Sequence, residues 1–364
     1  MQITVNDLDD LILGAVFLAT GGGGDPYVPQ LLTRQALEKF GPVNLIAAAE
    51  LADTDTVVTV GGVGAPTVSL ELLPSIDECV NPLNAFVTQT NTDLTALASF
   101  EIGGANSLVP IIAAAATGLP VIDGDGMGRA LPEAQMMTYA IKGVCPTPAF
   151  ACDYEGNITR FSTRTTATYE RHIRALAMSS GGMITTVEHP MTGKQLKDAI
   201  IPGTVSFSIQ LGKVLRQHRG SAAKMLPHLQ RLFGNSLYGH CELLMCGKVT
   251  DKATRIINGY DIGEATLLDF DVPDRKMKID IKNEYLRASI DDRIVTTVPD
   301  LIVVVDHETC QPINAERLQY GQRVAVFAIG CPAFFRTELA LQAVAPSCFG
   351  FDGDYVPMEE LLQH

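Results

Sequence analysis

The sequence predicts two domains: an α/β N-terminal domain over residues 1–165 and a β-rich, α+β C-terminal domain over residues 166–364. The chain has 364 residues, which is enough for two ordinary domains. In the first half, apolar strand-like segments alternate with helix-like segments and end in glycine-rich loops, as in α/β sheets. In the second half, short strand-like segments follow one another closely, which favours an antiparallel or barrel-like arrangement.

The elements of the first half are expected in this order. Apolar side chains recur at helical spacing over residues 5–20, and Gly21 to Gly24 end this helix. Asp25 and Pro26 are a typical helix start and open a second helix. The expected elements are helices at 5–20 and 27–40, a strand at 56–60, a helix at 108–116 and a strand at 120–122.

The second half begins with helical patterns and then becomes rich in strands. Turn residues separate the strand-like segments at regular intervals. The expected elements are helices at 169–178 and 193–219, then strands at 243–249, 254–260, 264–270, 276–281, 285–290, 294–298, 301–306 and 323–329.

Charge and composition exclude some classes of partner. A formal net charge of −14 argues against nucleic-acid or anionic-membrane binding, because both depend on basic patches. The N-terminus lacks a signal-peptide pattern, and no apolar run is long enough to cross a bilayer. We therefore expect a cytoplasmic protein with a small-molecule substrate and no membrane or nucleic-acid partner. The 46% of hydrophobic residues is compatible with an oligomer interface, and we expect a homo-oligomer.

The segment from Gly118 to Glu133 is expected to be the functional centre. A short apolar strand leads into a glycine-rich loop that holds Asp123, Asp125 and Arg129. In α/β sheets, ligands bind outside the carboxyl ends of strands, where this loop is expected. On an extended strand the two aspartates would face the same side and could act as an acid–base pair or hold one divalent metal ion. The alternative is a structural turn locked to Arg129.

Two further loops carry candidate ligand groups. The run Gly21–Gly24 could present backbone N–H groups to a ligand, or it could simply allow two helices to pack closely. Glu101 and Asn106 flank a Gly-Gly pair before a predicted helix, where Asn106 could be an N-cap and Glu101 a solvated loop residue. Glu133 could line the same pocket or stabilise a helix start.

Histidine and cysteine patterns give no metal or nucleophile signature. No Cys-x-x-Cys or His-x-x-x-His pair occurs, so a structural zinc site is disfavoured and the thiols are expected to be reduced and mostly buried. His189 looks like an ordinary surface or helix position. Cys331 follows an apolar strand, where a nucleophile could lie, although no partner histidine is readable.

Several motifs together resemble the S-methyl-thiohydantoin desulfurase-like family, which is associated with hydantoinase and oxoprolinase proteins. They are Thr20-Gly-Gly-Gly-Gly-Asp-Pro26, Gly64-Ala-Pro-Thr67, Glu101-x-Gly-Gly-x-Asn106, the segment 118–129, Pro132-Glu-x-Gln135, Asp300-Leu-Ile-Val-Val-Val-Asp306, Tyr320-Gly-Gln-Arg-Val324 and Phe349-Gly-Phe-Asp352. The resemblance implies an N-terminal α/β domain, a β-rich C-terminal domain and chemistry on a hydantoin-like ring. The absence of tryptophan near Cys331 departs from the family pattern.

The resulting hypothesis is a hydrolase acting on a small cyclic amide or thiohydantoin-like ring. An aspartate would activate water or hold a divalent metal ion, and Glu101 or Glu133 would protonate the leaving group. The alternative is a non-catalytic metabolite-binding or regulatory subunit of a hydantoinase-type partner. The expected catalytic residues are Asp123, Asp125, Glu101 and Glu133; the expected substrate-binding residues are Gly22, Gly23, Gly24, Asp25, Thr67, Asn106, Arg129 and Gln135.

Overall fold

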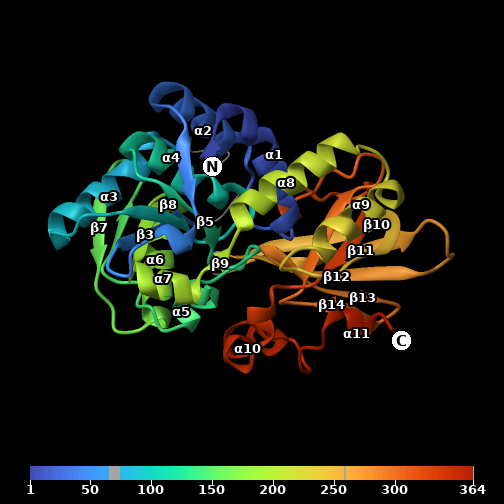
Figure 1. Ribbon diagram of the computed structural model, residues 1–364. Helices are drawn as coiled ribbons and strands as arrows, with labels where there is room; N and C mark the ends of the chain where they lie inside the picture. The colour runs from blue at the N-terminus through green and yellow to red at the C-terminus, as the bar shows by residue number, and fades with distance from the viewer. Residues whose placement is uncertain (65–73, 258–259, 364) are drawn as a thin grey trace.

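The computed structural model describes residues 1–64, 74–257 and 260–363, and within these ranges the strands form two sheets (Figure 1). The first sheet has the order β1-β2-β5-β4-β3-β8-β6-β7, with β9 paired to β5. Its strands are β1 (Gln2–Ile3), β2 (Val43–Ile46), β3 (Thr56–Gly64), β4 (Ala96–Ser99), β5 (Val121–Asp125), β6 (Ala149–Cys152), β7 (Ile158–Phe161), β8 (Met183–Thr192) and β9 (Ile201–Pro202).

The centre of the first sheet is parallel and its flanks are antiparallel. Strands β2, β5, β4 and β3 run parallel, whereas β8 pairs antiparallel with both β3 and β6. Central strands such as β4 are buried along their whole length, as expected for a parallel sheet covered by helices. The α-helices within the described ranges are α1 (Leu8–Leu18), α2 (Tyr27–Phe40), α3 (Ile76–Thr90), α4 (Val109–Thr117), α5 (Thr138–Ile141), α6 (Thr166–Ser179), α7 (Gly193–Ala199), α8 (Thr204–Gln217), α9 (Ala222–Gly234), α10 (Glu338–Val344) and α11 (Met358–Leu361).

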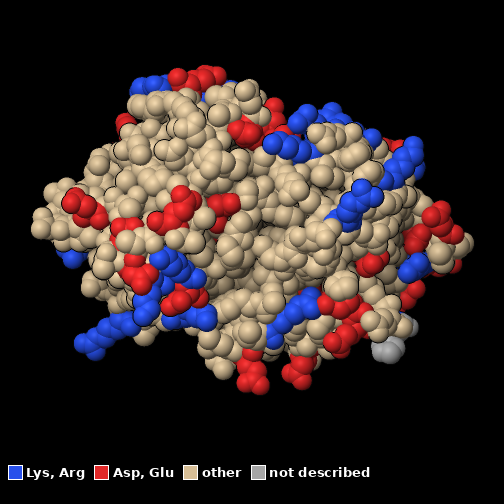
Figure 2. Space-filling view, in the orientation of Figure 1, with Lys and Arg blue, Asp and Glu red and all other residues tan. Residues whose placement is uncertain are grey.

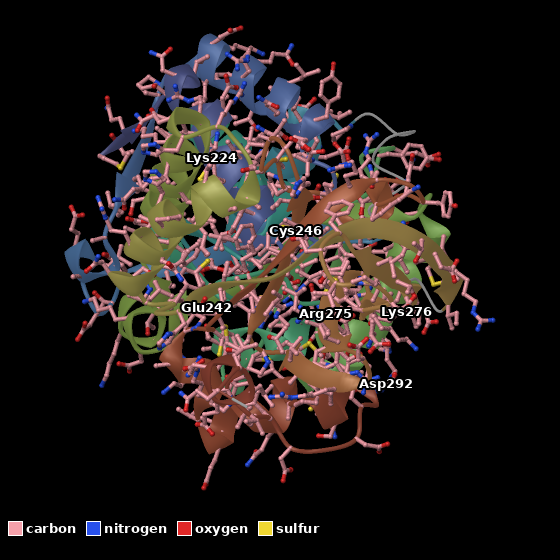
Figure 3. All side chains as sticks on the ribbon, turned by 90° about the vertical axis from the view of Figure 1, so that its right-hand side faces the viewer. Lys224, Glu242, Cys246, Arg275, Lys276 and Asp292 are labelled. Carbon is pink, nitrogen blue, oxygen red and sulfur yellow. The ribbon has the colours of Figure 1, made fainter. Side chains whose placement is uncertain are left out.

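The second sheet is a curled antiparallel sheet with the order β14-β13-β12-β11-β10-β16-β15. Its strands are β10 (Cys241–Ile257), β11 (Tyr260–Asp269), β12 (Lys276–Lys282), β13 (Glu284–Ile290), β14 (Arg293–Thr297), β15 (Leu301–Asp306) and β16 (Arg323–Ile329). Figure 3 looks onto the end of the molecule that this sheet forms, with Lys224 of α9 above Cys246 of β10. The predicted combination of an α/β domain and a β-rich domain is confirmed.

Several observed elements have no counterpart in the expected order, among them β2, α3, β4, β6, β7 and α9, and others have different bounds. The helix predicted over 193–219 is divided into α7 and α8, because Pro202 and Gly203, with a φ of 77°, lie between them. The strands predicted at 243–249 and 254–260 are one long strand, β10. Strand β8 has no counterpart among the expected elements, and with β9 it extends the first sheet to Pro202, past the expected boundary at residue 165.

Helix α1, near the N-terminus, packs closely against α8, which lies near the middle of the sequence (Figure 1). A Cβ atom added to Gly14 would lie 1.9 Å from the backbone oxygen of Ser208, so this crossing requires glycine.

Charged side chains of both signs lie in mixed groups over the face shown in Figure 2, with uncharged surface between the groups. Within the described ranges, none of the helices has the length and apolar character that a membrane span needs.

Candidate active site

A cavity of about 150 Å³ lies where β3 and β4 end. Asn283, between β12 and β13 of the second sheet, and Glu284, the first residue of β13, also line it. Both sheets therefore contribute to one cavity, at the carboxyl edge where α/β proteins bind ligands. A dry apolar cavity of similar volume, about 150 Å³, can hold a ring of benzene size. The size of the cavity therefore suits one small ring.

Glu101 is a buried carboxyl group on the wall of this cavity. Its Oε1 accepts a hydrogen bond from Asn106 Nδ2 at 2.7 Å, and its Oε2 accepts one from the backbone N–H of Leu131 at 3.2 Å. The backbone of Gly62 holds Asn106 in turn: Asn106 Nδ2 donates to the Gly62 oxygen, and Asn106 Oδ1 accepts from the Gly62 N–H group. Burial raises the pKa of Glu101 to about 8, although the hydrogen bonds from Asn106 and Leu131 lower it.

Glu284 supplies a second buried carboxyl group to the cavity, and sequence analysis missed it. Its Oε2 makes no hydrogen bond with any described residue. Burial raises the pKa of Glu284 well above its ordinary value, and the neighbouring Glu101 carboxyl raises it further, whereas Arg129 lowers it. The sequence signal was weak, because a single glutamate at the start of a predicted strand is a common surface feature.

Another wall of the cavity carries Tyr169 from α6 and Glu188 from β8, which sequence analysis also missed. Tyr169 Oη donates a short hydrogen bond to Glu188 Oε2. The expectation for the next residue, His189, was wrong, because its side chain is fully buried in β8. No strand was expected here, so nothing in the sequence placed these groups inside the molecule.

Asp123 and Asp125 lie outside the cavity and do not face one ligand. Asp123 Oδ1 accepts a hydrogen bond from the backbone N–H of Ser206 in α8. Asp125 Oδ2 accepts three, from the backbone N–H groups of Ile102, Met127 and Gly128, at 2.7 to 3.0 Å.

Strand β5 pairs irregularly with β4 between Val121 and Asp125, a segment that includes Asp123. Leu97 of β4 pairs with Val121, but Ser99 pairs with Asp125, so β5 contains two extra residues at this point. The spacing of two residues therefore no longer places both carboxylates on one face. This corrects the expectation that Asp123 and Asp125 act together. Among the residues described, no group of three or more His, Cys, Asp or Glu side chains could hold a metal ion.

Arg129 connects the two domains and has no N–H group left for a ligand. Its side chain is fully buried and donates to the backbone oxygens of Ala130, Pro299, Asp300 and Tyr285 and to Thr20 Oγ1. The expected substrate contact is thus replaced by a structural one.

Asp25 lies away from the cavity as well. It accepts a hydrogen bond from the backbone N–H of Tyr27 and forms an ion pair with Arg317.

The glycine run allows close packing, although against the second sheet and the loop at Gly103 rather than between two helices, and its role in ligand binding stays a prediction. A Cβ atom on Gly22 would lie 2.1 Å from Glu284 Oε1, so this glycine allows the second sheet to approach closely. Gly23 and Gly24 line the cavity. Gly23 also packs against Gly103, where a Cβ atom would lie 2.2 Å from the backbone oxygen.

Glu133 lines the cavity, where its Oε1 forms an ion pair of 2.6 Å with Lys282 of β12. Gln135 donates a short hydrogen bond to Glu133 Oε2 and does not line the cavity. Thr67 lies outside the described residues. Of the expected site residues within the described ranges, the cavity brings together Glu101, Glu133, Asn106, Gly23 and Gly24.

Comparison with known proteins assigns both halves of the chain. The model of the S-Me-THD-like N-terminal domain matches residues 6–163, and that of the S-Me-THD-like C-terminal domain matches residues 164–358. The chain is also similar to an X-ray crystal structure of a protein from Chromobacterium violaceum, with 26% sequence identity and a TM-score of 0.81. That similarity covers 98% of this chain and 100% of the other. No curated protein matches the chain.

Proposed function

This chain belongs to the S-Me-THD-like family, and we propose that it is a hydrolase acting on a small cyclic amide or thiohydantoin-like ring. The observation that carries the proposal is the pair Glu101 and Glu284, two buried carboxyl groups from different domains on one ring-sized cavity. Two carboxyl groups in unlike surroundings are a common basis for general acid and general base catalysis.

We assign Glu101 as the general base. Both of its oxygens accept hydrogen bonds, and such bonds favour the ionised form. Glu284 is assigned as the general acid, because its buried Oε2 has no donor among the described residues and the protonated form is therefore favoured. The two groups interact, so they titrate as a pair.

The reaction follows from these roles. Glu101 removes a proton from water, whose oxygen attacks the ring carbon that carries sulfur. In an S-methyl thiohydantoin, the C–S bond then breaks, Glu284 protonates the departing sulfur, and methanethiol leaves. As water adds, the π electrons of the C=N bond move to the ring nitrogen, and they re-form the double bond when the C–S bond breaks. The remaining water proton then passes to that nitrogen, so the ring carbon becomes a carbonyl group. Glu101 releases its proton to solvent and Glu284 takes one up before the next turnover. Asn106 positions Glu101, since it holds the carboxyl group against the backbone of Gly62.

Turnover of an S-methyl thiohydantoin by the purified chain tests the proposal, with released methanethiol as the readout. Glu284→Gln and Glu101→Gln should each reduce kcat about 100- to 10 000-fold, which is the usual contribution of a positioned acid or base. The matched control is Asp125→Asn, whose amide oxygen can still accept the three backbone N–H groups, so turnover should stay within about threefold. Full activity of Glu284→Gln together with an inactive Asp125→Asn would overturn the assignment. Activity only after addition of a hydantoinase-type protein would support the regulatory-subunit alternative instead.

A further inference from the structure

We propose that Glu188 and Tyr169 form a second subsite of the same cavity, at which Glu188 accepts a hydrogen bond from a ring N–H group of the ligand. The inference rests on the proposed function, because it specifies which part of a cyclic amide this wall would bind. Neither residue takes part in the water attack or the proton transfers assigned above.

The contacts of Glu188 within the described ranges leave one of its oxygens without a hydrogen bond. The side chain is 1% exposed, and Oε2 accepts hydrogen bonds from Tyr169 Oη and from Thr186 Oγ1, the latter at 3.2 Å. Oε1 makes no hydrogen bond with any described residue. His189 Nδ1 lies 3.1 Å from Oε1, but neither ring nitrogen of His189 has hydrogen-bond geometry toward a described residue.

Among the described residues that line the cavity, only Glu188 and Glu284 carry a buried side-chain oxygen without a hydrogen bond. Buried polar atoms nearly always have a partner, because leaving one without a partner destabilises the folded state. Glu188 and Tyr169 both line the cavity, so a ligand can supply the missing donor. Glu188 Oε1 therefore points to a ligand with an N–H group.

The sheet places this subsite at a suitable separation from the carboxyl pair. Glu101 follows β4, and Glu188 lies on β8, with β3 between these two strands. Strands separated by one neighbour are about 10 Å apart. Glutamate side chains that reach into the cavity from these positions can contact two different parts of one ring.

The chemical consequence is a preference for an unsubstituted ring nitrogen. A methyl group on that nitrogen would remove the donor and leave Oε1 unpaired. Sites that are built to bind a ligand N–H or O–H group reject analogues without it strongly, so a difference of at least about 100-fold in Kd is expected.

Calorimetric titration with hydantoin and its two N-methyl derivatives tests the subsite. The wild-type chain should bind hydantoin at least about 100-fold more tightly than one of the two derivatives. Glu188→Gln places an amide N–H₂ group where Oε1 was, so it should weaken hydantoin binding and abolish this difference. Thr186→Val is the matched control, because it removes a donor to Oε2 and leaves Oε1 unchanged; the difference should persist.

Equal binding of all three probes by the wild-type chain would overturn the subsite, as would a Glu188→Gln variant that keeps the difference. If Glu188→Gln does not fold, Glu188→Asp is tested instead. Its side chain is one methylene shorter, so the carboxylate is withdrawn and the difference in Kd between hydantoin and the N-methyl derivative should also disappear. A failure of the proposed function is distinguishable: an intact N–H preference without turnover of S-methyl thiohydantoin would refute the hydrolase and retain the subsite.

Discussion

Replacing Glu101 by glutamine should change how the stability of the protein depends on pH. The folded state raises the pKa of Glu101 from 4.5 to about 8, mainly through burial. Between these two values the folded state binds this proton and the unfolded state does not. The contribution of Glu101 to stability is therefore complete below pH 4.5 and is lost as the pH rises through 8.

The size of the effect follows from the shift. A pKa difference of one unit corresponds to about 1.36 kcal/mol, so the whole shift corresponds to about 5 kcal/mol. From about pH 6 to about pH 9, the free energy of unfolding should fall by about 2.5 kcal/mol more in the wild-type chain than in Glu101→Gln. This is an upper limit, because Glu284 titrates together with Glu101. Burial also raises the pKa of Asp125, to about 6, so only the comparison with the variant isolates Glu101.

Urea unfolding of both proteins at several pH values measures this difference. Glu38→Gln, at an exposed position of α2, is the control and should run parallel to the wild-type chain at every pH. The free energy of unfolding of the wild-type chain minus that of Glu101→Gln should fall as the pH rises. A value that stays constant or increases with pH would refute the reasoning. It would mean that the Glu101 carboxyl is not held in its protonated form by burial.

Three further outcomes are expected. The kcat/KM for S-methyl thiohydantoin should rise with pH through about 8, because the proposed base must first lose its proton; a flat profile contradicts this. Gly22→Ala places a methyl group 2.1 Å from Glu284 Oε1 and should reduce kcat about 100-fold, whereas Gly220→Ala, with its nearest neighbour 3.7 Å away, should leave it unchanged. Arg129→Met leaves buried backbone oxygens without donors and should cost about 3–5 kcal/mol in urea unfolding, against at most about 1 kcal/mol for Arg34→Ala at an exposed ion pair.

Local patterns predicted some elements of the fold closely, because helix starts and apolar spacing are short-range signals. The helix over 27–40 and the strand at 301–306 have the bounds that were expected. Pairing between strands is a long-range property, and it escaped prediction. The irregular register of β5 against β4, which separates Asp123 from Asp125, depends on a neighbour more than twenty residues away.

The site was predicted in part for the same reason. Glu101 and Asn106 belong to one loop, and their proximity could be read from spacing. Glu284 lies 183 positions beyond Glu101 in the sequence, and it reaches the cavity only because the second sheet docks against the first. Glu188 lies on a strand that was not predicted at all.

The docking of the two domains is what creates the carboxyl pair. Arg129, from the first domain, donates to the backbone oxygen of Tyr285, the residue next to Glu284. Gly22, also from the first domain, leaves the space that Glu284 occupies. Arg129 and Gly22, which the sequence suggested as ligand contacts, therefore fix the position of Glu284, the proposed acid, relative to Glu101. Glu101 and Glu284 belong to different domains, so only the contact between the domains brings them together. A substitution that weakens this contact should therefore reduce turnover before it unfolds either domain.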